Sequence, residues 1–426
     1  MASRLDRRCF LNRMARSCLG VATLPFMSGA SWANVERQIA ANGGRKPAKH
    51  VIFLFMMGGQ SHIDTWDPKP GAESQGPLEA VRTSVAGIQL SSHLGRVAKH
   101  MDELAIVRSL TSKEGSHPRG QYQLHTNYPP LGTVKHPSMG AWILKEAGRL
   151  NASLPGNVTI GGRAAYGAGF FGSAQEPFMV NRADQGLSNL ERPAGVTRER
   201  QDARLKLMDD LDSDFRTRFP DESVAAYTRY YAEAVKMMYS DDVRAFDLDR
   251  EPDTMRQRYG DDPFGRGLLL ARRLVQSGVR FVEVAYNGWD THQDNFERVE
   301  ELSDPLDRGL SALIQDLKST GLLDETLIVV ATEFGRTPRI NGQGGRDHYP
   351  RAFSAAFAGG GIRGGQVFGK TDSAGARVVD SPVTLADVNA TIAHAMGLDP
   401  QLEVRSPAGR PFKMCADGEP IRALFS

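Results

Sequence analysis

Cysteine is scarce in this chain, with three among 426 residues. Cys9 and Cys18 lie close to the N-terminus, which leaves Cys415 alone in the rest of the sequence. Once the N-terminal segment is removed, no intramolecular disulfide can form, even in a compartment that permits one. The fold must therefore be stabilised by its hydrophobic core.

A long apolar run is also missing from the N-terminal region. Residues 18–27 are modestly apolar, but a membrane-spanning helix needs about 20 such residues. Arg7 and Arg8 precede this stretch, and a small-x-small cleavage site ends at Ala33. This arrangement predicts a twin-arginine (Tat) signal peptide over residues 1–33. We therefore expect a periplasmic or secreted protein, with the Tat translocase as partner during export and no stable membrane span.

The sequence also has no large excess of positive or of negative charge. The whole chain has 52 basic and 50 acidic residues. Residues 1–33 contain five of the basic and one of the acidic residues, so the remaining chain has 47 against 49. This balance does not favour nucleic acid as a partner. We expect residues 34–48 to be a linker and residues 49–426 to form the folded domain, which is long enough for a core with an insertion.

Short apolar runs alternate with helical periodicity along this domain. Residues 50–57, 279–286 and 326–331 have the continuous apolar pattern of buried strands, and residues 306–317 have one apolar helix face. Strand followed by helix, repeated, predicts an α/β fold with a mostly parallel sheet and helices on both faces. Between about 197 and 276 the sequence becomes charged and helical, which predicts a helical insertion.

A glycine run at residues 359–365 formally contains the GxGxxG pattern. A dinucleotide site requires this loop to open a helix, and the residues that follow are typical of a strand or turn. We therefore expect a glycine-rich turn between strands.

Oxygen and imidazole donors gather between residues 288 and 349. Three of them, Asp290, His292 and Glu333, directly follow apolar runs, and Asp347 and His348 lie shortly after. An open α/β sheet presents its ligand-binding groups at the ends of such strands. Carboxylate and imidazole sets bind hard or borderline divalent metals. The sequence therefore predicts a site for one or two divalent ions, with Zn, Ca, Mg and Mn all open.

Six segments follow one another in a specific order: GGQSHIDTWDPKPG, SHPRGQYQLHTNY, GWDTHQDNF, TEFGRTPR, GGRDHYPRAF and AGGGIRGGQVFG. This series closely resembles the bacterial family known as domain of unknown function 1501, whose members are often Tat-exported and look like relatives of the alkaline phosphatase and sulfatase superfamily. The resemblance covers about residues 49–398. It implies an alkaline-phosphatase-like three-layer fold and metal-dependent ester chemistry.

The metal ligands of that superfamily can be matched to this sequence one at a time. Asp64 is the carboxylate nearest to the end of the first strand, where the superfamily has its first metal Asp. Asp290 and His292 resemble the Asp and His of a later loop. Glu333 resembles the carboxylate that follows another strand, and His348 resembles the final His.

The nucleophile is implied less directly. In related phosphodiesterases and sulfatases it begins a helix that ends before a Tyr-Pro-like turn, and residues 125–129 resemble that ending. Counting back places Ser116 or His117 at the nucleophile position. Ser116 would attack as an activated alkoxide, whereas His117 would equally serve as a metal ligand. Arg119 and Arg336 are placed to bind a phosphate or sulfate by bidentate hydrogen bonds.

Two of these residues have an alternative structural role. Arg336 could satisfy backbone carbonyls or pair with Glu333, and Asp347 could orient His348 instead of binding metal. No Cys-x-Pro-x-Arg motif occurs, so formylglycine chemistry is not expected.

The leading hypothesis is an exported, metal-dependent, formylglycine-independent hydrolase of small-molecule or glycan esters of phosphate or sulfate. The alternative is a noncatalytic binding protein on the same fold, with sulfated glycans as one candidate ligand. Phe334 favours the alternative, because it stands where the superfamily has a second imidazole.

Overall fold

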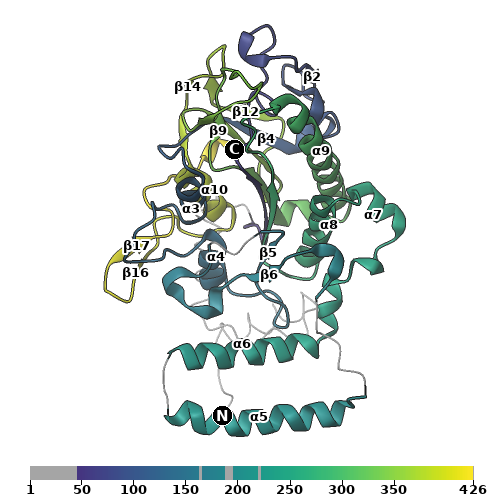
Figure 1. The fold of residues 1–426 in the computed structure, drawn as a ribbon, viewed down its shortest axis with the longest axis vertical. Coiled ribbons are helices and arrows are strands. Elements are labelled where there is room, and N and C mark those ends of the chain that lie inside the picture. The colour runs from purple at the N-terminus through teal and green to yellow at the C-terminus, as the bar shows by residue number, and fades with distance from the viewer. Residues whose placement is uncertain (1–45, 163–165, 188–194, 219–221, 426) are drawn as a thin grey trace, which may run out of the picture. The chain divides into compact units, whose positions relative to one another are not determined.

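The central element of the fold is a mixed, mostly parallel β-sheet (Figure 1). The computed structural model describes residues 46–162, 166–187, 195–218 and 222–425. The predicted signal peptide, residues 1–33, and most of the predicted linker lie outside the described residues. Within them, nine strands form the sheet in the order β12-β4-β11-β8-β1-β7-β5-β6, with β15 paired to β4. β11 is antiparallel to both of its neighbours, and the other pairs are parallel.

The strands of this sheet are β1 (His50–Met57), β4 (Leu104–Thr111), β5 (Asn157–Ile160), β6 (Phe178–Val180), β7 (Phe281–Asn287), β8 (Thr326–Ala331), β11 (Phe353–Ala358), β12 (Gln366–Phe368) and β15 (Val383–Thr384). Short strands form separate two-stranded sheets: β2 (Ala80–Arg82) with β3 (Gln89–Ser91), β9 (Gly335–Arg336) with β10 (His348–Tyr349), β13 (Lys370–Thr371) with β14 (Val378–Asp380), and β16 (Glu403–Arg405) with β17 (Pro411–Lys413).

The described α-helices are α3 (His117–Thr126), α4 (Met139–Ala147), α5 (Arg198–Arg218), α6 (Glu222–Met238), α7 (Asp253–Tyr259), α8 (Pro263–Gln276), α9 (Asn295–Ser319) and α10 (Leu385–Ala395). In the part of the chain that is described, none of the helices has both the length and the apolar character that a membrane crossing requires.

The sheet is buried on both faces because its central strands are apolar throughout. In β1, alternate side chains enter opposite core clusters, with Ile52, Leu54 and Met56 on one face and Val51, Phe53 and Phe55 on the other. α8 and α9 cover the first face, and α3, α4 and α10 cover the second (Figure 1). The predicted α/β fold, with a mostly parallel sheet and helices on both faces, is confirmed.

The interval predicted as a helical insertion contains α5, α6, α7 and α8. Leu268, Leu269 and Leu270 of α8 are fully buried in the core, so this helix belongs to the layer that covers the sheet. α5 and α6 precede that layer and contact each other through side chains such as Tyr231 and Met208. We therefore propose that an insertion consists of these earlier helices.

The strands β8, β1 and β7 are neighbours and parallel, so their carboxyl ends meet at one edge of the sheet. Glu333, Gly58 and Asp290 follow these three ends. Gly58 has a φ of 120°, and a Cβ placed on it would lie 2.5 Å from the Asp290 backbone nitrogen. Only glycine permits this close approach without strain. The local sequence after β1 thus allows the Asp290 loop to lie directly against it.

The loop after β7 is held against the loop that leads to β10. The Arg346 backbone N–H donates to the Thr291 carbonyl at 3.0 Å, and Gln293 and Gly344 form an isolated β-bridge. A Cβ on Gly345 would overlap the His292 carbonyl. These backbone contacts bring the segments around His292 and His348 together.

A buried ion pair fastens the same two loops to the segment after β1. The carboxylate of Asp64 accepts hydrogen bonds at 2.8 Å from Nε and Nη2 of Arg346 and from the Asn295 amide. The side chains of Asp64 and Arg346 are both fully buried. Charges without solvent require such complete pairing, and removing one partner leaves the other uncompensated.

We expect Asp64→Ala to lower the free energy of unfolding by about 3–5 kcal/mol, because it leaves the Arg346 guanidinium buried without its partner. Chemical denaturation followed by circular dichroism measures this change. The control is Asp304→Ala, which removes a carboxylate that pairs with Arg96 and Arg308 at the surface and should change stability far less. Equal effects of the two substitutions would contradict a supporting role for the buried pair.

Candidate metal centre

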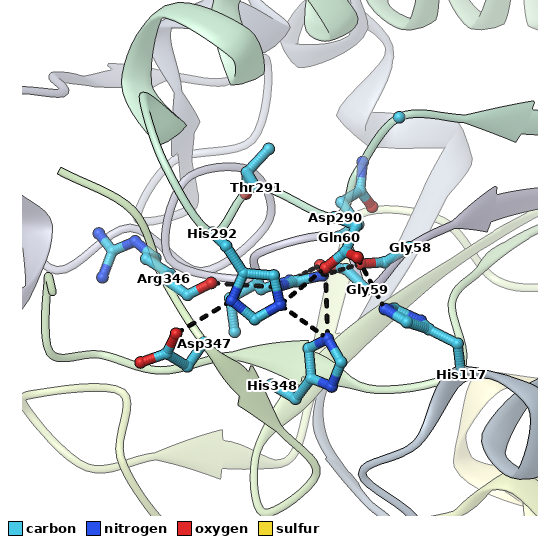
Figure 2. Close-up of polar contacts among 12 residues, drawn as sticks. Gly58, Gly59, Gln60, His117, Asp290, Thr291, His292, Arg346, Asp347 and His348 are labelled. Atoms are coloured by element: carbon cyan, nitrogen blue, oxygen red, sulfur yellow. Dashed lines mark hydrogen bonds and ion pairs between the residues drawn. The ribbon is translucent and has the colours of Figure 1, made fainter. Parts of the chain in front are cut away.

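Three histidine side chains converge on the Asp290 carboxylate (Figure 2). The Nε2 atom of His117 lies 3.2 Å from Asp290 Oδ2. The Nε2 atoms of His348 and His292 lie 3.2 Å and 3.1 Å from Oδ1, and they are 3.0 Å from each other. Among the described residues, His117, Asp290 and His348 form a group whose donor atoms all lie within 4.8 Å of one another. His292 lies beside this group as a fourth donor.

The opposite nitrogen of each ring faces an oxygen acceptor. His117 Nδ1 lies 2.7 Å from Glu333, His292 Nδ1 lies 3.0 Å from Asp347, and His348 Nδ1 lies 2.8 Å from the Gly115 carbonyl. An acceptor at Nδ1 places the proton there, which leaves the lone pair on Nε2. All three lone pairs then point into the same small volume, which is the arrangement of histidines that bind a metal.

The spacing of these donors fits a single divalent ion. His117 Nε2 is buried and makes no hydrogen bond of acceptable geometry with any described residue, although Asp290 is close. In a tetrahedral zinc site, bonds of about 2.0–2.1 Å separate the ligand atoms by about 3.3 Å. The contacts of Asp290 with the three rings and of His292 with His348, at 3.0–3.2 Å, are close to this value, whereas the donors that all lie within 4.8 Å of one another are those of His117, Asp290 and His348. These three residues therefore fit such an ion, with His292 beside them.

The surrounding charges keep Asp290 ionised. Burial by itself raises the pKa of this carboxyl, but the ion pair with Arg336 outweighs burial and lowers it. Burial lowers the pKa of His117, yet Glu333 and Asp290 outweigh it and raise that pKa. For His348, burial dominates and lowers the pKa, which favours the neutral imidazole that a metal requires.

Glu333, predicted as a ligand, lies behind His117. It is fully buried and accepts hydrogen bonds from His117 Nδ1 at 2.7 Å, the Gly58 N–H at 3.0 Å, the Thr332 hydroxyl at 3.0 Å and the Gln121 amide at 3.1 Å. Protein donors thus occupy its oxygens. The structure gives it the position of a carboxylate that orients His117.

Asp347, also predicted as a ligand, has a similar position behind His292. Its Oδ1 atom lies 3.0 Å from His292 Nδ1 and accepts from the Asn341 amide at 3.3 Å. The sequence alternative, in which Asp347 orients a histidine, agrees with this geometry. The histidine that it contacts is His292, whereas the sequence indicated His348.

The structure does not bring Asp64 into the cluster, because Arg346 and Asn295 engage both of its oxygens. Arg336 agrees in part with the alternative that the sequence left open, in which it satisfies backbone carbonyls, but its carboxylate partner is Asp290 and not Glu333. Its side chain is fully buried and pairs with Asp290, while its nitrogens also donate to the carbonyls of Gly58, Gly59 and Arg346. It is placed to hold Asp290 and the loop after β1, and the geometry does not support its predicted grip on a substrate oxyanion.

Arg119 and Ser116 lie at the start of α3. Nε and Nη2 of Arg119 both donate to the Glu114 carboxylate at 2.8 Å. Neither Arg119 nor Ser116 lines the cavity that the next paragraph describes. The predicted role of Arg119 in binding an oxyanion is therefore not supported. Ser116 is exposed and directly precedes His117. Of the two candidates for the nucleophile position, His117 lies among the converging donors.

A cavity of about 590 Å³ opens beside the cluster. Its described walls come from the ends of β1, β5 and β7, from α3 and from Tyr166. The lining residues are Phe55, Met57, Gly58, His117, Gln121, Thr159, Gly161, Gly162, Tyr166, Pro177, Glu283, Ala285, Asn287 and Asp290. The donor cluster therefore borders a space that can hold a small molecule.

Two supporting residues were not indicated by sequence reasoning. Gln121 contacts Glu333, and Asn341 contacts both Asp347 and the His292 carbonyl at 2.9 Å. The position of Gln121 one helical turn after His117 is a signal that could have placed it on the same helix face. Asn341 lies in a loop, where no periodic signal exists.

The profile described as "Protein of unknown function (DUF1501)" matches residues 48–425. No curated protein matches the chain. Among solved structures, the PsFucS1 sulfatase from Pseudoalteromonas sp. is 15% identical, with 93% of this chain and 75% of that chain covered and a TM-score of 0.43. A protein in the alkaline phosphatase superfamily from Vibrio parahaemolyticus is 12% identical, with 92% of this chain and 78% of that chain covered and a TM-score of 0.39.

The phosphonate monoester hydrolase SpPMH from Silicibacter pomeroyi is 13% identical, with 88% of this chain and 76% of that chain covered and a TM-score of 0.36. At these sequence identities and TM-scores, the structural similarity supports no conclusion about function. The profile match spans nearly all of the chain that the structure describes, and the chain therefore belongs to the DUF1501 family of proteins of unknown function.

Proposed function

We propose that this protein is a metal-dependent hydrolase of phosphate or sulfate esters. The observation that carries the proposal is the convergence of three imidazole Nε2 atoms on Asp290 at the edge of a cavity. A divalent ion at such a point supplies a Lewis acid for an ester oxygen and for the developing charge of the reaction.

The donor set favours zinc over calcium or magnesium. His117, His292 and His348 would bind through Nε2 and Asp290 through a carboxylate oxygen. Zinc is bound by nitrogen and oxygen donors of this kind, whereas calcium and magnesium prefer oxygen donors alone. The donors of His117, Asp290 and His348, which all lie within 4.8 Å of one another, support one ion.

Ser116 and His117 are the two residues that the sequence indicated for the nucleophile position, and Ser116 directly precedes His117 at the start of α3. Because His117 lies in the cluster, we assign the nucleophile to the Ser116 hydroxyl. Its oxygen would form the new bond to phosphorus or sulfur, and the alcohol of the ester would leave. Water would then release the acid and restore the serine.

Export through the Tat route is part of the proposal. It is supported by Arg7 and Arg8 ahead of the short apolar stretch. The Tat route transports folded proteins, which suits a chain that has one cysteine after residue 33 and assembles its donors from distant segments.

Metal analysis tests the centre directly. We expect about one equivalent of zinc per chain in the purified mature protein, and loss of this zinc in His348→Ala. Asp347→Asn should weaken zinc binding by about 10–100-fold, because it removes the carboxylate that orients His292. Hydrolysis of 4-nitrophenyl phosphate or sulfate should fall with the zinc content.

The matched control for these substitutions is His100→Ala, a histidine that contacts Ser311 and lies outside the cavity. It should keep both zinc and activity. Full activity after complete removal of zinc would contradict the proposal. Zinc binding without turnover of any phosphate or sulfate ester would instead establish the noncatalytic alternative.

The nucleophile is tested by Ser116→Ala. We expect hydrolysis to fall by about 1,000-fold or more, as when other nucleophilic serines are removed, while the zinc content stays constant. Ser213→Ala, an exposed serine of α5, is the control. An unchanged kcat in Ser116→Ala would transfer the role of nucleophile to water.

The export signal is tested in the full-length chain. Replacing Arg7 and Arg8 together by lysine should leave the uncleaved precursor in the cytoplasm of a Tat-competent bacterium. Cell fractionation and the mass of the protein measure this result. Normal appearance of the mature protein in the periplasm would exclude the Tat route.

A further inference from the structure

One face of α3 carries three polar side chains that are one helical turn apart. They are His117, Gln121 and His125, whose spacing of four residues places them on the same side of the helix. His117 belongs to the donor cluster, and Gln121 lines the cavity beside it together with Tyr166. This face of the helix therefore connects the proposed metal centre with the cavity wall.

Gln121 and His117 meet at one oxygen of a buried carboxylate. Glu333 Oε1 accepts from His117 Nδ1 at 2.7 Å and from Gln121 Nε2 at 3.1 Å. Glu333 is fully buried, so the position of this oxygen is set by the protein donors that surround it. That position in turn sets the direction in which the His117 ring presents Nε2 to the cluster. The Gln121 amide thus takes part in orienting a metal donor from one helical turn away.

The Tyr166 hydroxyl favours one orientation of this amide. It donates to Gln121 Oε1 at 3.3 Å, which leaves Nε2 directed at Glu333. In the opposite orientation, the amide oxygen would face the carboxylate, and two acceptors would repel each other. Hydrogen bonds linked in series also polarise one another. Donation by Tyr166 therefore strengthens the donation by Gln121 to Glu333.

His125 holds the Tyr166 ring in place. The two rings are stacked, with centroids 4.4 Å apart and an angle of 20° between their planes. His125 is buried, its Nδ1 donates to the Gln121 carbonyl at 2.7 Å, and its Nε2 lies 3.2 Å from Glu283 Oε2. This stacking does not depend on the hydroxyl. Phenylalanine at position 166 would therefore lack one hydrogen bond and keep the packing of the ring.

We propose that Tyr166 and Gln121 are positioning residues of the metal centre, and that they act on His117 through Glu333. This inference rests on the proposed function, since it concerns the same metal centre, but zinc binding tests it without ester hydrolysis. Hydroxyl, amide, carboxylate and imidazole form one chain of hydrogen bonds from the cavity wall to the donor cluster. Through this chain the two residues raise the affinity for zinc without binding the ion themselves.

The zinc affinity of two single variants tests each step of the chain. Competition with a chelator of known affinity gives the dissociation constant of zinc in the mature protein. Gln121→Met removes the amide but keeps the length of the side chain, and it should weaken zinc binding about 10-fold, as expected for a residue that orients a ligand. Tyr166→Phe removes the hydroxyl alone and should weaken zinc binding about threefold, as expected for one hydrogen bond.

The double variant distinguishes a chain from two separate effects. If Tyr166 acts through Gln121, its hydroxyl has no amide to orient in the double variant, which should then bind zinc as tightly as Gln121→Met alone. Independent effects would multiply to a loss of about 30-fold. The matched control is Tyr122→Phe, because Tyr122 lies next to Gln121 on α3 and its hydroxyl contacts His136. It should keep the wild-type zinc affinity.

Cobalt(II) in place of zinc provides a spectroscopic readout, because its visible absorption depends on the geometry of the bound donors. Gln121→Met and Tyr166→Phe should both shift the absorption bands of the cobalt-loaded protein, and Tyr122→Phe should not. The midpoint of chemical denaturation of the metal-free protein should be the same in Tyr166→Phe as in the wild type. A change in zinc affinity then reports on the metal centre and not on the overall fold.

An unchanged zinc affinity in Tyr166→Phe, or effects that multiply in the double variant, would overturn the inference even if the protein hydrolyses esters. A loss of affinity in Tyr122→Phe equal to that in Tyr166→Phe would overturn it as well. The expected affinities in a protein that hydrolyses no phosphate or sulfate ester would contradict the proposed hydrolase alone and leave the positioning role in place. A wild-type protein that binds no zinc would overturn both.

Discussion

The ion pair between Arg336 and Asp290 is the interaction on which the site depends. Arg336 is fully buried, and its other donors go to carbonyls of the segments after β1 and before β10. It therefore fixes the Asp290 carboxylate in position and holds it ionised against the effect of burial. The three imidazoles gather around this fixed charge. Without Arg336, Asp290 would lose both its orientation and much of the reason for its ionisation.

The charges around Asp290 also bear on the proposed metal centre. Three carboxylates, those of Asp290, Glu333 and Asp347, contact the imidazoles, and Arg336 balances one of them. Two negative charges remain, which a divalent ion would balance. Protons on the rings can supply part of this charge, and the raised pKa of His117 favours one there, but protons on the Nε2 atoms of both His292 and His348 would face each other at 3.0 Å and repel. In the proposed metal centre, an ion would take the place of these protons.

The sequence predicted the strands more reliably than the roles of the side chains. The runs 50–57 and 326–331 coincide with β1 and β8, because continuous apolar patterns depend on local composition alone. The position of Asp64 after β1 could be predicted, but its partner Arg346 lies 282 residues away, and no local pattern links them. The same holds for His117 and Glu333, which are 216 residues apart. Strand order brings such residues together, and it is set by packing over the whole chain.

The protein partners of the two arginines with a predicted role at the site change how an ester would be recognised. Arg119 and Arg336 were expected to bind the oxyanion, yet the first pairs with Glu114 and the second with Asp290. In the proposed hydrolase, recognition of the anionic part would then depend on the bound ion. The described lining of the cavity beside the cluster contains amide and hydroxyl groups, which would contact the rest of the molecule.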